Sequence, residues 1–321
     1  MRYCITGITG TLGHALTRHL LADPRTERIV GISRNEHRQV EMERVIADPR
    51  FEAWIGDVRD RDCLHWVFRA GFDAVIHGAA LKRIETCEEH PDEAYKTNVL
   101  GTWHVVEAAM LADVPKVLVV SSDKSAEPAL SYGRTKAAAE DLALGQNAKR
   151  GKGRTRISVA RYGNVIGSTG SVIEQFFRCR ATGESLRITD PTWTRFWWSP
   201  EEAAAFVDSV LARMQGAEIW VPRLVSATVL ALAQAIAPRS AVQVIGARGV
   251  EKPHETMIGV LEAGYTWALP DAYVLLPKHG QWWSPDPPAG AVKVPEGFRF
   301  SSDQDPQPVT FVPDGEFACV S

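Results

Sequence analysis

The stretch from Arg2 to Leu21, RYCITGITGTLGHALTRHLL, decides the fold of this chain. A short apolar run ends at Thr6, a glycine-spaced turn follows at once, and then a helical pattern begins. Glycines let the backbone turn tightly and approach a phosphate group, which the free N–H groups at the start of a helix can bind. The pattern predicts a strand–turn–helix unit that binds a dinucleotide, with a purely structural turn as the alternative. The predicted cofactor-binding residues are Gly7, Thr9, Gly10, Thr11, Leu12 and Gly13.

The same alternation of short apolar runs and amphipathic stretches continues through the first half of the chain. It is typical of repeated βαβ units and predicts an α/β fold with a doubly wound parallel sheet of the Rossmann type. The expected strands are Arg2–Thr6, Arg28–Ile32, Phe51–Ile55, Ala74–His77, Lys116–Val120 and Arg156–Arg161. The expected helices are Leu12–Leu21, Arg38–Ala47, Arg61–Arg69, Pro91–Leu111 and Ser131–Lys149.

From Gly167 the pattern changes to longer polar stretches, aromatic clusters and proline-rich segments. We therefore expect a nucleotide-binding domain over residues 1–166 and a smaller C-terminal α/β substrate lobe over residues 167–321. Residues 196–222 are expected to return to the first domain, with Ile219–Val221 as a strand of its sheet.

Composition excludes several classes of partner. The chain has 321 residues, a formal net charge of −3 and a pI near 6.3, so nothing favours nucleic acid or an anionic membrane as a partner. The five cysteines are widely spaced, which indicates free thiols, no metal site and a cytoplasmic protein. We expect no signal peptide, and the longest nearly apolar run, residues 225–237, is too short to span a bilayer.

The end of the second predicted strand indicates which dinucleotide binds. An NAD site usually has Asp or Glu there, whereas this chain has Ser33-Arg34, and a hydroxyl with a guanidinium suits the 2′-phosphate of NADP. A solvated loop is the alternative. Further along, Asp57 and Val58 follow the third strand and Ala79 and Ala80 follow the fourth, where they could line the adenine and the pyrophosphate.

The reacting end follows the fifth strand, which delivers Ser122, Asp123 and Lys124 to the edge where ligands bind in open α/β sheets. Tyr132 and Lys136 lie four residues apart on a predicted helix and so share one face, where a cation favours the phenolate. Asn98 could support this group from a neighbouring helix, although a buried capping asparagine is an equal alternative.

At this point the chain resembles a known family. The glycine turn, Ser122, Tyr132 and Lys136 form the pattern of extended short-chain dehydrogenase/reductases. The pair Asp123-Lys124 resembles the sequence at this position in the inverting UDP-N-acetylglucosamine 4,6-dehydratases of flagellin-glycan and polysaccharide biosynthesis. So do the strings SRNEHRQVEM, GDVRD, AALKRIETCEEHPDEAYKTNVLGT, RYGNVIGSTGSVI, ITDPTWTRFW, EKPHE and GFRFSSDQDPQ, which run through almost the whole chain.

The resemblance implies a mechanism. Tyr132, helped by Ser122 and Lys136, would oxidise C4 of a UDP-N-acetylhexosamine with NADP as hydride acceptor. Asp123 would then protonate the departing C6 hydroxyl, and Lys124 would remove the C5 proton. Lys124 can act as a base only if burial or cations lower its pKa, while Asp123 raises it, so we expect the two to titrate as a coupled pair.

The family also implies substrate contacts and an assembly. Lys82 matches a lysine near the active site, at the border of cofactor and substrate. Matches near the UDP group are Asn164, Arg195, Arg248 and Glu251. Family members form dimers or hexamers, so a homo-oligomer is expected.

Two other functions stay open on the sequence alone. A nucleotide-sugar 4-epimerase or reductase needs Ser122, Tyr132 and Lys136 but gives Asp123 and Lys124 no chemical role. A non-catalytic NADP-binding protein has no reason to keep an acid, two amines and a phenol together. The sequence also departs from the family at Thr169, where an arginine is usual, and over residues 261–270, so a different hexosamine or nucleotide is possible.

Overall fold

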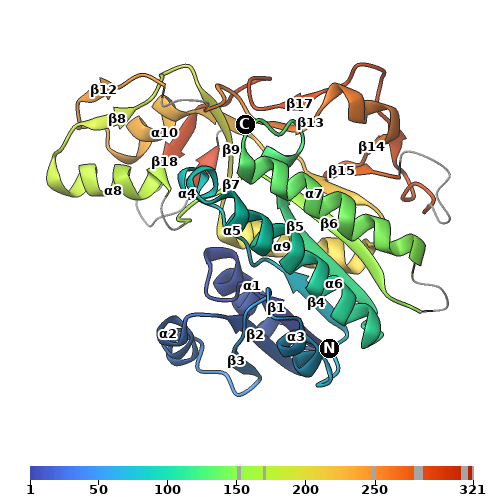
Figure 1. Ribbon diagram of the computed structural model, residues 1–321. Helices are drawn as coiled ribbons and strands as arrows, with labels where there is room; N and C mark the ends of the chain where they lie inside the picture. The colour runs from blue at the N-terminus through green and yellow to red at the C-terminus, as the bar shows by residue number, and fades with distance from the viewer. Residues whose placement is uncertain (150–152, 169–170, 248–250, 278–284, 312–316, 320–321) are drawn as a thin grey trace.

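The computed structural model is organised around one ten-stranded sheet in the order β16-β14-β15-β10-β6-β5-β4-β1-β2-β3 (Figure 1). It describes residues 1–149, 153–168, 171–247, 251–277, 285–311 and 317–319. The strands of this sheet are β1 (Arg2–Thr6), β2 (Arg28–Ser33), β3 (Phe51–Ile55), β4 (Ala74–His77), β5 (Lys116–Ser122), β6 (Arg156–Tyr162), β10 (Ile219–Pro222), β14 (Thr266–Ala268), β15 (Ala272–Leu275) and β16 (Val292–Lys293).

The seven strands from β3 to β10 are parallel, which confirms the predicted doubly wound α/β sheet. Their near-continuous apolar sequences fit burial on both faces. Strand β5 runs to Ser122, two residues beyond its predicted end, because its pairing with β6 continues to the Ser122–Tyr162 pair. This extension puts Ser122 on the last position of a central strand.

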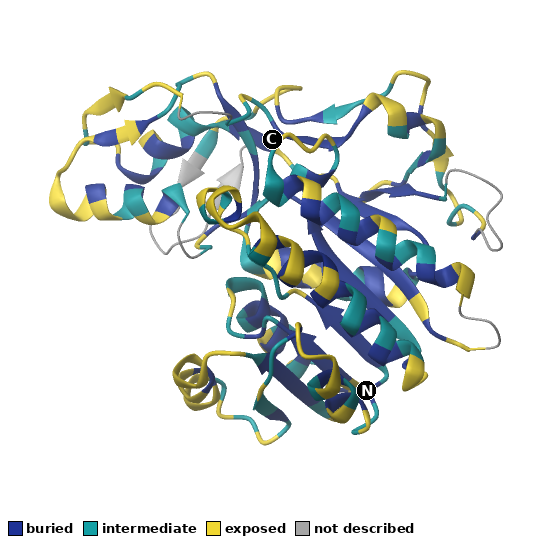
Figure 2. Cartoon of the chain, in the orientation of Figure 1, coloured by how far each residue is buried: buried dark blue, intermediate teal, exposed yellow. Residues whose placement is uncertain are grey.

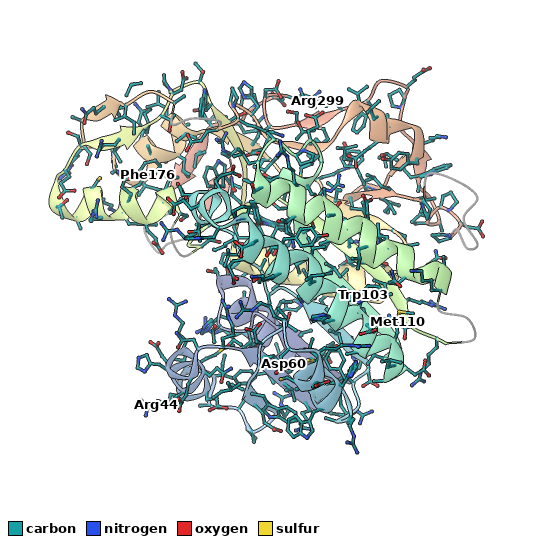
Figure 3. The ribbon with its side chains drawn as sticks, in the orientation of Figure 1. Arg44, Asp60, Trp103, Met110, Phe176 and Arg299 are labelled. Carbon is teal, nitrogen blue, oxygen red and sulfur yellow. The ribbon has the colours of Figure 1, made fainter. Side chains whose placement is uncertain are left out.

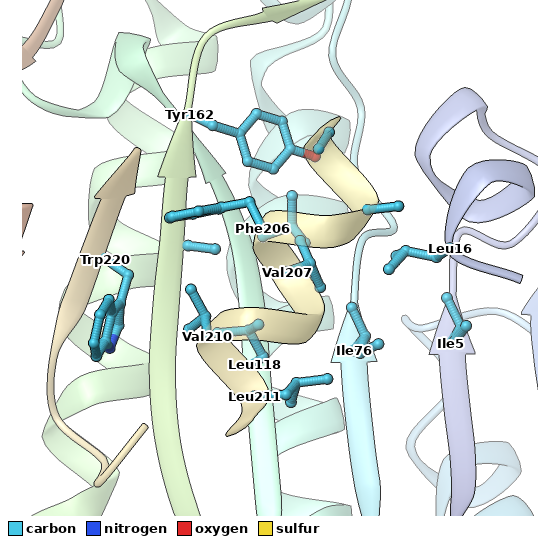
Figure 4. Packing of buried hydrophobic residues seen from close by; sticks show 14 of the residues in the cluster. Ile5, Leu16, Ile76, Leu118, Tyr162, Phe206, Val207, Val210, Leu211 and Trp220 are labelled. Carbon is cyan, nitrogen blue, oxygen red and sulfur yellow. The ribbon is translucent and has the colours of Figure 1, made fainter. Parts of the chain in front are cut away.

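Helices cover both faces of the sheet, and successive strand residues face opposite sides. On one face, Ile5, Ile76 and Leu118 pack against α1 (Thr11–Leu21), α2 (Glu36–Ile46) and α9 (Pro200–Arg213), as Figure 4 shows in part. On the other face, Cys4, Val75 and Val117 pack against α3 (Arg61–Phe68), α6 (Gly101–Leu111) and α7 (Ser131–Gly145). The central strands β4, β5, β6 and β10 are accordingly almost entirely buried in Figure 2, whereas the edge strands β3 and β16 are more exposed.

The predicted helix from Pro91 to Leu111 is interrupted. It consists of α5 (Pro91–Tyr95), a π-helical turn over Lys96–Leu100 and α6, and it follows a short helix, α4 (Ile84–Glu89), that the sequence pattern did not indicate. A π turn inserts an extra residue, is rare, and is found mostly at functional sites. Here it contains Asn98.

A second lobe lies beside the carboxyl ends of the main strands (Figure 1). Its own apolar core includes Phe176, labelled in Figure 3. It contains a sheet in the order β11-β9-β7, a parallel pair of β8 and β12, and two helices. Their bounds are β7 (Asn164–Val165), α8 (Val172–Thr182), β8 (Leu186–Ile188), β9 (Thr194–Trp198), β11 (Ser226–Thr228), α10 (Val229–Ile236) and β12 (Val242–Val244).

The chain passes between the two parts more than once. Of the predicted return segment 196–222, residues 196–198 lie in β9 of the second lobe, while α9 packs on the main sheet and β10 is a strand of it. The strands β14, β15 and β16, expected in the substrate lobe, extend the main sheet in antiparallel fashion. Two antiparallel pairs complete the described fold: β13 (Thr256–Ile258) with β17 (Phe300–Ser301), and β18 (Val309–Phe311) with β19 (Phe317–Cys319). Trp197 is buried in the core of the second lobe, whereas Phe196 is buried in the main-sheet cluster, against Phe300. No helix among the described residues is both long and apolar enough to pass through a membrane.

Candidate active site

A cleft of about 920 Å³ lies past the carboxyl ends of the parallel strands and reaches the second lobe. Most of the residues predicted from the sequence line it. They are Gly7, Thr9, Gly10, Thr11, Leu12, Gly13, Ser33, Arg34, Asp57, Val58, Ala79, Ala80, Lys82, Ser122, Lys124, Tyr132, Lys136, Asn164, Arg195 and Glu251. Asp123 and Asn98 are not among its described lining residues, and Arg248 lies outside the described residues.

The glycine turn is a cradle that side chains would fill. Gly7 has φ of +74°, and a Cβ built on it would lie 2.7 Å from the backbone nitrogen of Ala79. A Cβ on Gly13 would lie 2.1 Å from the carbonyl oxygen of Ile8. Gly10 precedes α1, whose N-terminus has no side-chain cap. Free N–H groups at the positive end of a helix, beside backbone that can be approached closely, fit the pyrophosphate of a dinucleotide.

The end of β2 lies at the far side of this cradle. The amide of Gln39 donates to both the carbonyl and the hydroxyl oxygen of Ser33, at 2.8 and 2.9 Å, and so fixes that residue. Arg34 lies close enough to Asp57 to help lower the pKa of that carboxyl, although burial opposes this and Arg59 at 2.6 Å is the main partner. Arg34 therefore adds a positive charge at this end of the cleft, whereas Arg59 is paired with Asp57 and Glu93 and is not among the described lining residues.

Asn98 lies behind the cleft rather than in it. Its side-chain oxygen accepts from the N–H of Leu81 at 2.7 Å, and its amide nitrogen donates to the carbonyl of Leu81 and the hydroxyl of Thr135, both at 3.0 Å. All its polar atoms are thus used within the protein. Asn98 thus ties the loop after β4 to helix α7. A contact of Asn98 with the cofactor, which is also predicted for this residue, stays a prediction.

The acid and the amine that follow β5 form one buried group. Ser122 donates to Asp123 Oδ1 at 2.7 Å, and the Lys124 Nζ donates to the same oxygen at 3.0 Å. Asp123 is fully buried, and its second oxygen has no partner. The turn over Asp123–Ser125 is fixed to helix α7, because Ser125 donates to the carboxylate of Glu140. Glu140 in turn forms an ion pair with Arg161 at 2.6 Å.

A second carboxylate contacts Lys124 from a distant segment. Glu255 Oε1 lies 3.3 Å from Nζ, and Asn164 Oδ1 lies 3.4 Å from it. Burial alone would lower the pKa of Lys124, but Asp123 and Glu255 outweigh it and raise this pKa above its ordinary value. Lys124 was expected to act as a base only if its pKa is lowered, and in this structure its pKa is raised. Lys124 is held as an ammonium between two carboxylates.

Tyr132 and Lys136 share a face of α7, as predicted, and both line the cleft. Burial raises the pKa of Tyr132 to about 12, and the cation that opposes this is Lys124 rather than Lys136. Burial lowers the pKa of Lys136 to about 8, and its amine donates to the carbonyl of Val120 at 2.6 Å. Because the Tyr132 phenol is buried, the groups that can exchange a proton with it are those beside it in the cleft, such as Ser122.

Further residues that the sequence analysis did not select also line the cleft. Arg187 and Trp193 come from the second lobe, and Lys252 and Glu255 come from the segment before β13. Glu255 is the last residue of the string EKPHE, which served as evidence for the family resemblance. Its acidic side chain was the one sign in the sequence that it could belong to the site. The described residues contain no group of three or more His, Cys, Asp or Glu side chains that could hold a metal ion.

Comparison with known proteins gives consistent matches. The model of the family described as polysaccharide biosynthesis protein matches residues 3–276. A UDP-N-acetylglucosamine 4,6-dehydratase (inverting) of Campylobacter jejuni strain 81-176 is 38% identical over 94% of this chain and 92% of its own. A UDP-glucose 4-epimerase of Rickettsia massiliae is 36% identical over 84% of this chain and 81% of its own. The X-ray structure of Pen from Bacillus thuringiensis has a TM-score of 0.87, with 27% identity, over 95% of this chain and 93% of that one.

Proposed function

The chain belongs to the polysaccharide biosynthesis protein family and has the extended short-chain dehydrogenase/reductase fold, and we propose that it is an NADP-dependent UDP-N-acetylglucosamine 4,6-dehydratase that inverts C5. The product would be a UDP-4-keto-6-deoxy-N-acetylhexosamine for glycan or nucleotide-sugar biosynthesis. The observation that carries the proposal is the Asp123–Lys124 pair, which lies beside Ser122 in the cleft that Tyr132 and Lys136 also line.

The chemistry of the substrate explains why such a pair is needed. The C5 proton of a hexose is too weakly acidic to be removed directly, but oxidation of C4 places it next to a carbonyl. Bound NADP supplies the transient acceptor for the C4 hydride, which is returned at C6. An enzyme that only moves this hydride needs no acid and base beyond the tyrosine. An enzyme that also removes water needs one group for the C5 proton and another for the C6 oxygen.

The residues of the cleft divide this work. Tyr132 takes the proton of the C4 hydroxyl, with Ser122 holding that oxygen and Lys136 fixed behind it by Val120. Lys124 takes the C5 proton, and Asp123, one hydrogen bond from Ser122, supplies the proton to the departing C6 oxygen. Before this step Lys124 must give up the proton that Asp123 and Glu255 help it to hold, and Asp123, 3.0 Å away, is the acceptor in contact with it. When the hydride returns to C6, C5 takes a proton from solvent on its opposite face, which gives the inverted centre.

The remaining substrate and assembly assignments rest on the family. Lys82 and Arg195 line the cleft and suit a UDP group, because amines and guanidinium groups bind a diphosphate. Asn164 and Glu251 also line the cleft and keep their predicted role near the substrate. Arg248 keeps the same predicted role. A cytoplasmic location and assembly as a dimer or hexamer stay predictions.

A 4-epimerase is the second candidate, since a relative of that name is 36% identical. One experiment separates the two. The purified protein is incubated with UDP-N-acetylglucosamine in deuterated water, and the product is analysed by NMR and mass spectrometry. We expect loss of one water and deuterium at C5. A product of unchanged mass with protium at C5 would establish epimerisation instead, and no product with any UDP-hexosamine would favour a non-catalytic protein.

A further inference from the structure

Glu255 is a charged residue in contact with Lys124 that has no part in the reaction proposed above. Its backbone is held firmly: the N–H donates to the Ser302 hydroxyl at 2.9 Å, and the carbonyl accepts from the N–H of Ser302 at 2.8 Å and from the hydroxyl of Ser301 at 3.1 Å. Its side chain is 5% exposed, yet the residue lines the cleft. A carboxylate fixed in this way has a defined direction rather than a choice of solvated positions.

The two oxygens of Glu255 have different surroundings. Oε1 lies 3.3 Å from Lys124 Nζ and 3.8 Å from Arg195 Nε, whereas Oε2 is buried and has no hydrogen-bond partner in the part of the chain that the structure describes. Arg195 is itself held by the carbonyls of Thr194, Lys252 and Pro253, at 2.7, 3.0 and 2.9 Å. The lysine is thus the nearer of the two cations, and burying the carboxylate carries a desolvation cost that an active-site role would justify.

The charge of Lys124 changes during the proposed reaction. It must be an amine when it meets the C5 hydrogen, and it becomes an ammonium when the C–H bond breaks. Asp123 loses its own proton to the C6 oxygen in the same event, so the pair returns to the ionised form. A carboxylate that stays ionised beside the nitrogen throughout favours this change, as the aspartate of a serine-protease triad favours protonation of its histidine.

Resting on the proposed function, we propose that Glu255 is the positioning residue of the Lys124 base: it orients the nitrogen toward C5 and stabilises the ammonium that forms there. Asp123 is protonated until that step in the proposed reaction, so Glu255 is the carboxylate that is already ionised when the C–H bond begins to break. The polar and charged groups that face Lys124 from all packed elements are Asp123, Tyr132, Asn164, Arg195 and Glu255. Glu255 and Asp123 are the anions among them.

Glu255→Gln tests the proposal because it keeps the shape and one acceptor oxygen but removes the charge. The matched control is Glu127→Gln, a carboxylate that accepts from Thr256, next to Glu255 in sequence, but does not line the described cleft. Both variants and the wild type are given UDP-N-acetylglucosamine in deuterated water. Reduced cofactor absorbance reports hydride transfer from C4, and NMR reports deuterium at C5 and loss of water.

We expect Glu255→Gln to slow C5 exchange and water loss by about 10- to 100-fold, while hydride transfer and thermal unfolding stay near wild type. Removing the negative charge also lowers the pKa of Lys124, so the Lys124–Asp123 pair loses its shared proton at a lower pH. The alkaline limb of the pH profile of water loss, where activity falls, therefore moves to lower pH. Glu127→Gln should change neither. An unmoved basic limb with wild-type C5 exchange, or equal losses in hydride transfer and C5 exchange, would overturn the inference. If the wild type itself removes no water, it is the proposed function that fails.

Discussion

At the glycine turn the cleft is shaped by backbone, whereas at Lys124 it is shaped by charged side chains from separate segments. The first region is one continuous stretch in which Gly7 and Gly13 leave no room for a Cβ. The second brings together Asp123 and Lys124 after β5, Asn164 at β7 and Glu255 before β13. The nucleotide end therefore depends on steric fit and the reacting end on a balance of charge.

This difference means that the two regions should fail in different ways. A side chain added at the glycine turn must move backbone, so it should disturb both the fold and cofactor binding. A change of charge at Lys124 that keeps the volume should leave the fold and the bound cofactor in place and stop only the chemistry. Substitutions that separate these outcomes would sharpen the comparison.

The largest effect is expected from Lys124→Ala. Without the base, water loss should fall by about 10³-fold or more, because acid–base groups contribute roughly 10²- to 10⁴-fold, while hydride transfer at C4 continues. The measurement is the rate of dehydrated product by NMR beside cofactor reduction by absorbance. Turnover at the wild-type rate would remove Lys124 from the mechanism.

Lys124→Ala also leaves two carboxylates without their cation, so a charge-preserving variant is needed as a control. Lys124→Arg keeps a positive charge between Asp123 and Glu255, but a guanidinium does not lose its proton in proteins. It should fold like the wild type and still fail to remove water. Recovery of water loss in this variant would mean that the charge, and not the base, is what the reaction needs.

Gly13→Ala is expected to break the other region. Its Cβ would lie 2.1 Å from the Ile8 carbonyl oxygen, so the turn or α1 must shift. We expect a loss of about 1–3 kcal/mol in the free energy of unfolding and at least tenfold weaker cofactor binding. Gly145→Ala is the control, because no atom lies within 4 Å of its Cβ position at the end of α7. Denaturant unfolding and calorimetric titration measure both, and equal effects at the two glycines would refute the steric argument.

The same difference explains what the sequence could predict. The parallel sheet, the glycine turn and the Tyr132–Lys136 face follow from local spacing, because strand and helix periods fix which neighbours meet. Glu255 could not be found that way, since its contact with Lys124 depends on how β13 returns to the β5 edge. The sequence analysis included the effect of Asp123 on the pKa of Lys124, but the contribution of Glu255 was missed for the same reason. The π-helical turn that contains Asn98 left no local signal in the sequence.

The smallest effect is expected at the outer edge of the nucleotide end, where charge again contributes. Arg34→Ala should weaken NADP binding by about 10- to 100-fold, because a hydrogen bond to a charged group contributes roughly 1.5–3 kcal/mol, and should leave NAD binding unchanged. Arg44→Ala is the control, because Arg44 lies on α2 (labelled in Figure 3), which follows the Arg34 loop, and is not among the described lining residues of the cleft. Dissociation constants for both cofactors, measured at one ionic strength, decide the matter. Wild-type protein that binds NAD as tightly as NADP, or a variant that loses both equally, would take the 2′-phosphate away from Arg34 and leave the nucleotide end dependent on its backbone alone.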